Sequence, residues 1–285
     1  MRQTLEPTLI QRAEADARDA AARAGVEVVP LDDMEALTAA SALIADVWQT
    51  GDESQLPAEL MRAMTHAGNY AAGAYADGTM VGTIVGFLGR DDDGIYLHSH
   101  ILGVSKRHRG ANVGFALKEH QRAWSLARNI RKVTWTFDPL VRRNAHFNLQ
   151  KLGASATEYH ERFYGDMMDG INAGDETDRL LIVWQLDAPR AVEAASARLA
   201  EPSDAGTVAL AADGDEPRRG ELAGDIVLCQ TPADIIALRT TDPKRASRWR
   251  VALRETLGAA LHDGYRVAGF TRAGWYVLGR DGAVT

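Results

Sequence analysis

Cysteine is nearly absent from this chain, because its 285 residues include only one, Cys229. A single thiol excludes an internal disulfide and a cysteine-rich zinc site, and we interpret Cys229 as a packing residue. Long apolar runs and a recognisable signal peptide are missing as well. A chain without these features is expected to be cytoplasmic and to contact no membrane.

An excess of positive charge is missing too. The chain has 32 Lys and Arg residues against 39 Asp and Glu residues, which gives a formal net charge of −7 at pH 7. This acidic balance argues against nucleic acid as the main partner. The other proportions, 46% hydrophobic and 25% charged, are typical of a soluble globular protein. The length predicts about one and a half to two domains.

Basic residues are instead concentrated in one short stretch. A largely apolar run, 96–104, leads into a basic cluster with glycines and then into a helical pattern. Gly110 and Gly114 let the main chain approach a pyrophosphate, and the unpaired N–H groups of a helix start favour an anion. Arg107 and Arg109 add permanent charge. This order predicts a strand, a turn that cradles an anion, and a helix.

Two other interpretations of this stretch compete with an anion-binding turn. The first is an ordinary helix start with basic residues nearby, and the spacing alone leaves it open. The second is a dinucleotide-binding turn. It fits poorly, because 110–114 lacks the G-x-G-x-x-G order and no ribose-binding acid follows about 20 residues later.

Two motifs in this region carry a family resemblance. Val104-(x4)-Arg109-Gly110-Ala111-Asn112-Val113-Gly114-(x2)-Leu117 resembles the acyl-CoA pyrophosphate loop of the GNAT acetyltransferase superfamily. Downstream, Asn144-Ala145-(x5)-Lys151-Leu152-Gly153-Ala154 resembles that superfamily's second helix motif. The pieces YLHSHILGV, WTFDPL, RNAHFN, LGA, FYG and TDRL, in this order, are similar to one subgroup of predicted GNAT acetyltransferases. The resemblance covers roughly residues 25 to 187.

The resemblance implies a fold, a co-substrate and a site. The fold class is α/β, with a GNAT-like mixed sheet flanked by helices and with splayed parallel central strands. The co-substrate is acetyl-CoA or a related acyl-CoA, without a metal, and the acceptor is a small-molecule amine. Homo-oligomer formation stays open. The implied cofactor-binding residues are Leu102, Val104, Arg107, Arg109, Gly110, Ala111, Asn112, Val113, Gly114 and Asn144.

The sequence departs from the family pattern at two positions. Asn112 stands where a glycine is usual, so a backbone position that needs positive φ is expected to hold the next most tolerant residue type. Leu149 stands where many members carry the tyrosine that protonates the departing thiolate. The family's usual acid is therefore missing.

The order of elements predicts four regions. They are an N-terminal helix in 1–25, the acyltransferase domain in 26–187, a linker in 188–224, and a smaller C-terminal α/β subdomain in 225–285. Asp77-Gly78 predicts a hairpin. The helix after the loop is expected to expose Lys118, Glu119, Gln121, Arg122 and Arg128. The strand in 132–137 follows that helix and is expected to lie parallel to the central strand.

Two histidines are candidates for the base that removes a proton from the amine. His98 and His100 alternate with apolar or small residues, so both side chains lie on one face of the central strand, with His100 nearer the cofactor. Three interpretations compete: a buried hydrogen-bonded pair, a base role for His100, and a metal pair. The metal pair is weakly supported, because no acid or cysteine has ligand spacing.

Three further places are candidates for chemistry. Asp138 ends the second central strand near the expected thioester, although an Asp before a proline also starts turns. Tyr164 is the best substitute for the missing acid, and the alternative is an aromatic residue in a half-buried strand. Asp178 and Arg179 suit a carboxylate-bearing substrate, but a surface ion pair is the simpler interpretation.

These observations predict an acyl-CoA-dependent N-acyltransferase. It would transfer an acetyl group directly to a primary amine in a ternary complex, with His100, Tyr164 and Asp138 as the catalytic candidates. Two alternatives stay open: an N-succinyltransferase-like activity on amino acids, and a non-catalytic acyl-CoA-binding module.

Overall fold

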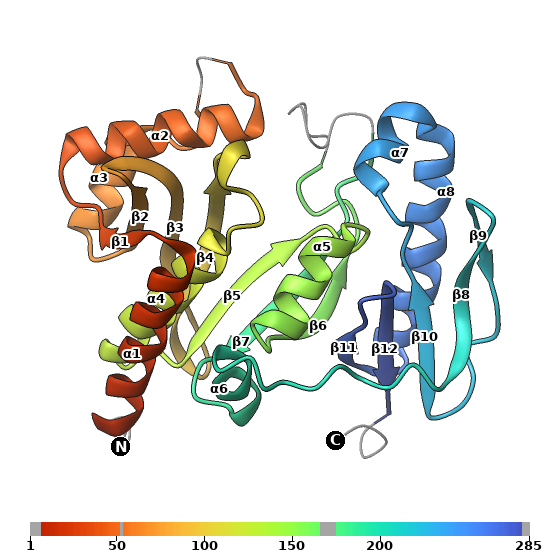
Figure 1. Ribbon diagram of the computed structural model, residues 1–285. Coiled ribbons are helices and arrows are strands. Elements are labelled where there is room, and N and C mark those ends of the chain that lie inside the picture. The colour runs from red at the N-terminus through yellow and green to blue at the C-terminus, as the bar shows by residue number, and fades with distance from the viewer. Residues whose placement is uncertain (1–6, 52–53, 166–174, 281–285) are drawn as a thin grey trace. The chain divides into compact units, whose positions relative to one another are not determined.

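The computed structural model describes residues 7–51, 54–165 and 175–280, so residues 1–6 of the predicted N-terminal segment lie outside it. Its contacts divide the chain into two compact units (Figure 1). The amino-terminal unit comprises residues 1–134 and 185–187, and the carboxy-terminal unit comprises residues 135–184 and 188–285. Residues 135–184 thus group with the C-terminal part, and not with the first unit as the predicted boundary at 187 implied.

The helices and strands form two sheets. The first unit contains α1 (Pro7–Ala24), β1 (Glu27–Pro30), α2 (Met34–Trp48), α3 (Ala58–His66), β2 (Tyr70–Ala76), β3 (Thr79–Asp91), β4 (Gly94–Val104), the 3-10 turn η1 (Lys106–His108) and α4 (Val113–Ala127), and β5 (Lys132–Phe137) crosses into the second unit. Then follow α5 (Arg142–Ala145), the π-helix η2 (His146–Lys151), β6 (Ser155–His160), β7 (Arg179–Gln185), α6 (Pro189–Ala195), β8 (Thr207–Asp213), β9 (Glu216–Arg219), β10 (Ile226–Gln230), α7 (Ile235–Thr241), α8 (Pro243–Leu253), the π-helix η3 (Arg254–Gly258), α9 (Ala259–His262), β11 (Arg266–Phe270) and β12 (Trp275–Gly279). The strand orders are β1-β2-β3-β4-β5-β7-β6 and β11-β12-β10-β8-β9. This mixed seven-stranded sheet with a separate C-terminal sheet confirms the predicted fold class.

The predicted hairpin is confirmed. Ala76 of β2 pairs with Thr79 of β3, and the two residues between them form the turn. Asp77 and Gly78 both have positive φ, 48° and 74°. Two-residue hairpin turns need positive φ at both positions to match the twist of the strands, and Asp-Gly meets this need.

Helix α4 is buried over most of its surface, which corrects the sequence-based expectation. Lys118, Glu119, Gln121 and Arg122 are all buried, and only Arg128 of the predicted exposed set is exposed. α1 lies alongside α4 (Figure 1) and covers the ion pair of Arg122 with Glu119, whereas Lys118 faces the sheet and donates to Ser99.

A buried cluster of charges joins α1 to α4. Arg122 Nη1 lies 3.1 Å from Asp16 Oδ2 and 3.4 Å from Glu119 Oε2, and Arg122 Nε donates to the carbonyl of Leu186 at 3.0 Å. Burial raises the pKa of Glu119 to about 7, although the neighbouring Arg122 and Arg23 lower it; Asp16 adds to the rise. Glu119 therefore binds its proton more tightly in the folded protein than in the unfolded chain.

Replacing Glu119 by glutamine is expected to stabilise the protein at pH 8 far more than at pH 5. Below pH 4.5 both states of the wild type keep the proton, whereas between pH 4.5 and 7 only the folded state keeps it. Wild-type stability that is present at low pH is therefore lost as the pH rises through about 7. The loss between pH 5 and pH 8 should be about 2–3 kcal/mol. Urea unfolding of both proteins at the two pH values measures it, and a pH-independent difference would contradict this assignment.

The predicted linker in 188–224 is wrong in part. Residues of α6 and of two strands, β8 and β9, fall within it. β8 pairs with β10 in parallel and with β9 antiparallel, so both strands belong to the C-terminal sheet. Their composition hid them, because β9 is the polar sequence EPRR and β8 has only a short apolar run. Pairing, and not local hydrophobicity, defines these strands: β8 pairs with β10, and β9 pairs with β8 in a hairpin.

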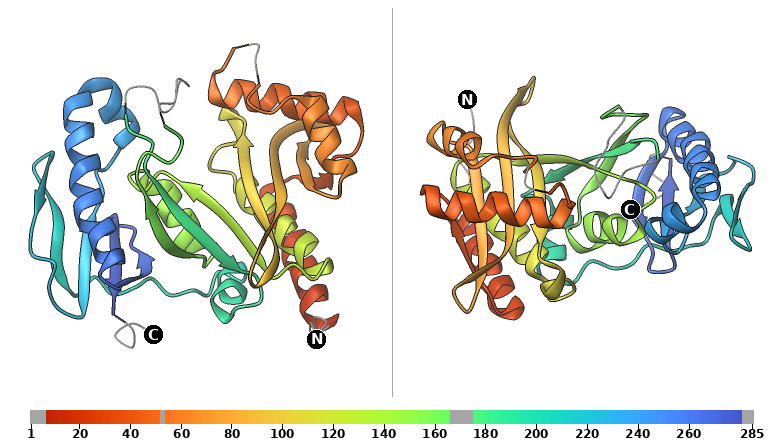
Figure 2. Two further views of the ribbon diagram at one scale, coloured as in Figure 1. Left: turned by 180° about the vertical axis from the view of Figure 1, so that it is seen from behind. Right: turned by 90° about the horizontal axis from the view of Figure 1, so that it is seen from above.

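The carboxy-terminal unit contains the same strand pattern twice. β5 is followed by a helical segment that includes η2 and by the hairpin β6–β7, whose second strand lies next to β5. β10 repeats this order with the helices that include η3 and with the hairpin β11–β12, as Figure 2 shows from two sides. β6 and β11 contact each other, and each contacts the π-helix of the other repeat. Reciprocal contacts of this kind are typical of parts related by a two-fold axis.

Candidate functional site

Strand β4 carries the residues around which the candidate site is arranged. It pairs with β3 antiparallel and with β5 in parallel, and the parallel pairing confirms the sequence-based expectation. That pairing covers only Leu97 with Val133 and His98 with Thr134. The pairing thus ends well before the carboxyl ends of both strands, as expected for strands that diverge toward those ends.

A β-bulge in β4 changes which residues face each layer. The register with β3 shifts between Ser99 and Ile101, so His100 is the extra residue on β4. A bulge re-aims the side chains that follow it. Ser99, before the bulge, accepts a hydrogen bond from Lys118 of α4 at 2.9 Å, whereas Ile101, after the bulge, joins the apolar cluster formed with α2 and α3. Nothing in the local sequence signalled this bulge.

The two histidines form a cluster with Phe87. The centroid of the Phe87 ring lies 4.9 Å from that of His98 and 5.7 Å from that of His100. His98 Nδ1 lies 3.1 Å from Oγ1 of Thr134. Loss of water contact lowers the pKa of His98 to about 4, with smaller effects of His100 and Lys118, and also lowers the pKa of His100. Both imidazoles are therefore neutral at pH 7, and His100 is the more exposed of the two.

Lys118 is a residue that the sequence reasoning assigned to the surface. Its side chain is buried between α4 and the sheet, where its Nζ donates to Ser99 Oγ at 2.9 Å and to Gln121 Oε1 at 3.1 Å. Burial holds the pKa of Lys118 well below its usual range. Lys118 therefore lies on the opposite face of β4 from the histidine cluster, and it packs against the strand on that face.

The basic loop after β4 has the geometry that its sequence predicts. The turn η1 is followed by Gly110 and Asn112, whose φ angles are 87° and 64°, and α4 begins at Val113. Asn112 thus adopts the left-handed conformation expected where the family pattern has glycine. Arg107, Arg109, Gly110, Ala111 and Asn112 are exposed, and Gly114 lies in the first turn of α4. The start of a helix and two arginines are open to an anion here.

An aromatic ring covers the end of β4 next to this loop. Leu102 and Val104, the other predicted contact residues of β4, are half-buried on either side of Gly103. A Cβ atom on Gly103 would lie 3.0 Å from the ring of Trp48 in α2, so glycine is needed for this close packing. The sequence identified Trp48 only as an apolar helix position. Trp48, whose indole is half-exposed, therefore belongs to the site region, although the sequence patterns did not indicate this.

Asp138, in the carboxy-terminal unit, is held by two arginines. Arg250 Nη1 and Nη2 donate to its two carboxylate oxygens at 2.7 and 2.9 Å, and Arg239 donates to Oδ2. Burial alone would raise the pKa of Asp138, but the charges and hydrogen bonds of both arginines outweigh it and hold that pKa well below its usual range. A carboxylate paired in this way is a poor proton acceptor. Its other predicted role, a turn after β5, agrees with its hydrogen bond from Leu140 N.

Tyr164 lies in a turn and not in a half-buried strand, the alternative given by the sequence, because β6 ends at His160. The residue is 42% exposed. Its hydroxyl lies 3.2 Å from Oγ1 of Thr136 in β5, and the guanidinium of Arg179 lies 5.2 Å from the ring centroid. The hydroxyl is thus placed beside β5, two residues before Asp138.

Asp178 and Arg179 do not form a surface ion pair with each other. Both are buried, and Arg179 Nη1 donates to the main-chain carbonyl of Asp178 at 3.0 Å. The carboxylate of Asp178 instead binds Arg254, with contacts of 2.7 and 2.9 Å, and accepts from the hydroxyl of Tyr159 at 2.7 Å. A structural role therefore explains Asp178 better than recognition of a substrate carboxylate.

The second motif forms a helix of mixed type. Asn144 is half-buried in α5, and the helix continues as the π-helix η2, which contains Leu149. Leu149, at the position of the family's tyrosine, is fully buried and offers no acid. Gly153 ends the helix with φ 65°, and a Cβ atom there would lie 2.5 Å from the carbonyl oxygen of Arg190. Packing as well as conformation requires this glycine.

The predicted site residues are thus divided between the units. His100, Leu102, Val104 and the loop over 107–114 belong to the amino-terminal unit, whereas Asp138, Asn144 and Tyr164 belong to the carboxy-terminal unit. Within the second unit, the hydrogen bond of Tyr164 to Thr136 brings two of these three candidates to the end of β5.

Comparison with protein families identifies the region that contains β4, the loop and the second motif. Residues 31–154 match the model of the acetyltransferase (GNAT) family. They form a GNAT acetyltransferase domain. Members of this family use an acyl-CoA as co-substrate, which agrees with the anion-accepting loop. No protein of curated function matches the sequence.

Solved structures that resemble the chain are also GNAT acetyltransferases. An acetyltransferase of the GNAT family from Streptococcus pneumoniae is 16% identical, with a TM-score of 0.44 over 55% of this chain and 98% of that one. The ribosomal-protein-S18-alanine N-acetyltransferase from Escherichia coli is 11% identical, with a TM-score of 0.46 over 57% and 95%. An aminoglycoside 6'-acetyltransferase type Ii is 16% identical, with a TM-score of 0.45 over 57% and 98%.

Replacing Gly110 in the GNAT domain by tryptophan is expected to weaken acyl-CoA binding about 100-fold or more. A side chain is strained at φ 87°, and an indole would block the approach of a diphosphate to the main chain. Two lost charge-assisted hydrogen bonds of about 1.5–3 kcal/mol each account for this size. Calorimetric titration with CoA measures it. Gly78→Trp, also at positive φ but in the β2–β3 turn, is the matched control. If wild type and both variants bind CoA with equal affinity, the loop is not the CoA-binding site.

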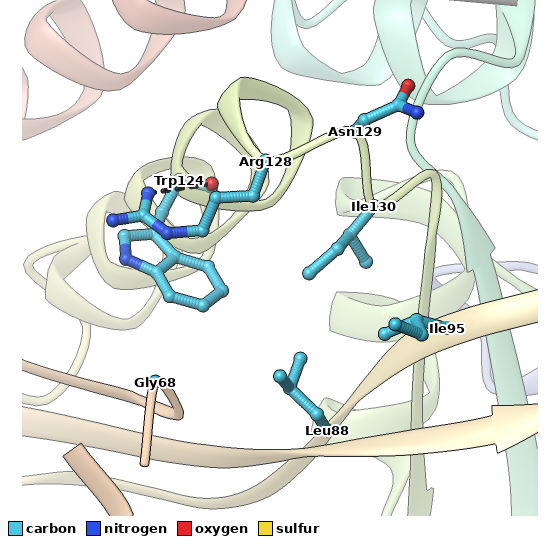
Figure 3. Close-up of a pocket in the computed structure, with 7 residues that line it drawn as sticks. All are labelled: Gly68, Leu88, Ile95, Trp124, Arg128, Asn129 and Ile130. Carbon is cyan, nitrogen blue, oxygen red and sulfur yellow. Dashed lines mark hydrogen bonds between the residues drawn. The ribbon is translucent and has the colours of Figure 1, made fainter. Parts of the chain in front are cut away.

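An apolar cavity of about 210 Å³ lies at the other end of the GNAT domain (Figure 3). Its lining includes Leu88, Ile95, Ile130 and Trp124, and the Arg128 guanidinium stacks 4.1 Å from a ring centroid of Trp124. Ile95 begins β4 and Trp124 lies near the end of α4, so this cavity is remote from the loop along both elements. It has no carboxylate or histidine in its lining, and we assign it no part in acyl transfer.

The described part of the chain holds neither a metal-ligand cluster nor a helix that could span a membrane. Within residues 7–51, 54–165 and 175–280, His, Cys, Asp and Glu side chains form no group of three able to hold a metal ion. None of the helices in these ranges combines the length and the apolar character that a membrane span requires.

Proposed function

We propose that the protein is an acyl-CoA-dependent N-acyltransferase that transfers an acetyl group to a primary amine within a ternary complex. The observation that carries this proposal is the loop after β4. It combines positive φ at Gly110 and Asn112, exposed Arg107 and Arg109, and the start of α4. These features suit a diphosphate that is bound by main-chain N–H groups and by guanidinium groups.

Each step of the transfer has a candidate group. The co-substrate supplies the acyl group as a thioester. His100, neutral because its pKa is lowered, would accept a proton from the attacking amine. A main-chain N–H of β4 near Leu102 or Val104 would stabilise the oxyanion, as main-chain donors do in acyl transfer. Tyr164, an exposed residue, would donate a proton from its hydroxyl to the leaving thiolate.

The family tyrosine is replaced by buried Leu149, and this observation favours one alternative function. A domain without an acid for the thiolate could bind acyl-CoA and not turn it over. Release of free thiol separates the two functions. Incubation with acetyl-CoA or succinyl-CoA and a panel of amines, amino acids and polyamines should release thiol with at least one acceptor. Tight CoA binding without thiol release from any combination would favour the binding module.

A further inference from the structure

A buried network of ion pairs connects α7 and α8 to the end of β5. Arg250 donates to both oxygens of Asp138 and, at 2.8 Å, to Asp175 Oδ2. Arg239 Nε also donates to Asp175 Oδ2, at 2.9 Å, and its Nη2 donates to Asp138. These four side chains are each less than 10% exposed. Two carboxylates and two guanidiniums thus neutralise one another away from water.

A second set of ion pairs begins one helical turn later. Arg254, the first residue of η3, binds both oxygens of Asp178 and also donates to Glu176. The Asp178 side chain is fully buried, and that of Arg254 is 18% exposed. Arg250 and Arg254 are four residues apart, so both side chains project from one face of the helix.

Asp178 of the second set and its neighbour Thr177 hold the main chain around Tyr164. Asp178 Oδ1 accepts from the N–H of Arg162 at 3.1 Å, two residues before Tyr164. The neighbouring Thr177 accepts from the N–H of Tyr164 through Oγ1 at 3.2 Å and donates to the carbonyl of Gly165 at 2.7 Å. These contacts fix the main chain on both sides of Tyr164.

The hydroxyl of Tyr164 is fixed through the other set. Its partner Thr136 lies in β5, two residues before Asp138, which Arg250 binds with two hydrogen bonds. The main chain of Tyr164 thus depends on Arg254 through Asp178, and its hydroxyl depends on Arg250 through the end of β5. Buried ion pairs often contribute little net stability compared with apolar residues of the same volume. Their directional contacts can instead fix a unique geometry.

We infer that Arg250 and Arg254 are positioning residues for acyl transfer, which act by holding Tyr164 in place. This inference rests on the proposed function, in which Tyr164 protonates the leaving thiolate. It gives the C-terminal repeat a role in the reaction although it supplies no reacting group. Neither arginine needs to contact the acyl-CoA or the amine.

The test compares two arginines near each other on the same helical segment. Arg254→Met keeps the length of the side chain and removes the contacts with Asp178. Arg248→Met is the control, since Arg248 pairs with Glu216 of β9, 2.6 Å away, and contacts nothing next to Tyr164. We expect Arg254→Met to reduce kcat about 10–100-fold, because small displacements of a reacting group have effects of this size. The affinity for CoA, the circular dichroism spectrum and the rate of Arg248→Met should stay within about 2-fold of wild type.

A double-mutant cycle separates positioning from general destabilisation. If Arg254 acts through Tyr164, adding Arg254→Met to Tyr164→Phe should cost less than about 3-fold more, because the group being positioned is already gone. Full, multiplicative losses in the double variant would overturn the inference. The inference would also be overturned if the single variant Arg254→Met kept wild-type turnover while the single variant Tyr164→Phe was slow.

Failure of the proposed function has a different result. If Tyr164→Phe keeps wild-type turnover, the acid is assigned wrongly, and the positioning inference is overturned with it. Arg254→Lys keeps the charge but not the two-pronged contact, and it should fall between wild type and Arg254→Met. A full rate in Arg254→Lys would mean that charge alone, without geometry, accounts for the effect, and would also overturn positioning.

Discussion

Replacing His100 by glutamine should reduce turnover by about 10²–10⁴-fold, the usual cost of losing a general base. The affinity for acyl-CoA should hardly change, because His100 lies on β4 before the loop and contacts no diphosphate. An alkylamine with a pKa near 10 is mostly protonated at pH 7 and must lose a proton before attack. His100 is neutral at this pH, since partial burial lowers its pKa.

The pH profile of kcat/KM gives the sharper measurement. Because the pKa of His100 is lowered, its neutral form persists below pH 6.5, and the acidic limb of the wild-type profile should lie below that value. The limb should disappear in His100→Gln. His66→Gln, an exposed histidine of α3, is the matched control and should behave like wild type. If His100→Gln keeps both the rate and the limb, then His98 or an ordered water becomes the base.

Ending the chain at Ala205 should abolish cooperative folding of the carboxy-terminal unit. The fragment loses Arg239, Arg250 and Arg254, so the buried carboxylates of Asp138 and Asp178 lose the guanidinium groups that neutralise their charge. Breaking one buried pair by removing a partner costs about 3–5 kcal/mol. Two or three such losses match the whole stability of a typical domain, about 5–15 kcal/mol.

Thermal unfolding followed by circular dichroism measures this loss. A fragment in which Asp138, Asp175 and Asp178 are replaced by asparagine should recover part of the stability, because no buried charge is then left unpaired. If the lost stability came from apolar packing alone, the fragments with and without these replacements would unfold at the same temperature. A fragment that ends at Ala205 and retains full stability and activity would rule out both the ion network and the dependence of the site on the C-terminal sheet.

Features that depend on a few neighbouring residues were determined by the sequence. The loop after β4, the left-handed conformation of Asn112 and the Asp77-Gly78 turn follow from which side chains tolerate a given pair of backbone angles. The parallel pairing of β4 with β5 follows from the helix between them. These local rules also contain the family motifs, so the acetyltransferase domain could be inferred before the fold was known.

Features that depend on partners far along the chain were decided by the tertiary structure. A polar helix face predicts exposure, but α1 covers Glu119 and Arg122, and Asp16 is 106 residues away from the guanidinium it binds. Asp138 is a catalytic candidate by sequence, but Arg250, 112 residues later, binds both of its carboxylate oxygens and makes it a poor proton acceptor. The bulge that makes His100 the extra residue of β4 depends on the register of β4 with β3, and β8 joins the C-terminal sheet through its parallel pairing with β10. Spacing along the chain carries no record of such contacts, because their energy comes from burial and from charges brought together only by folding.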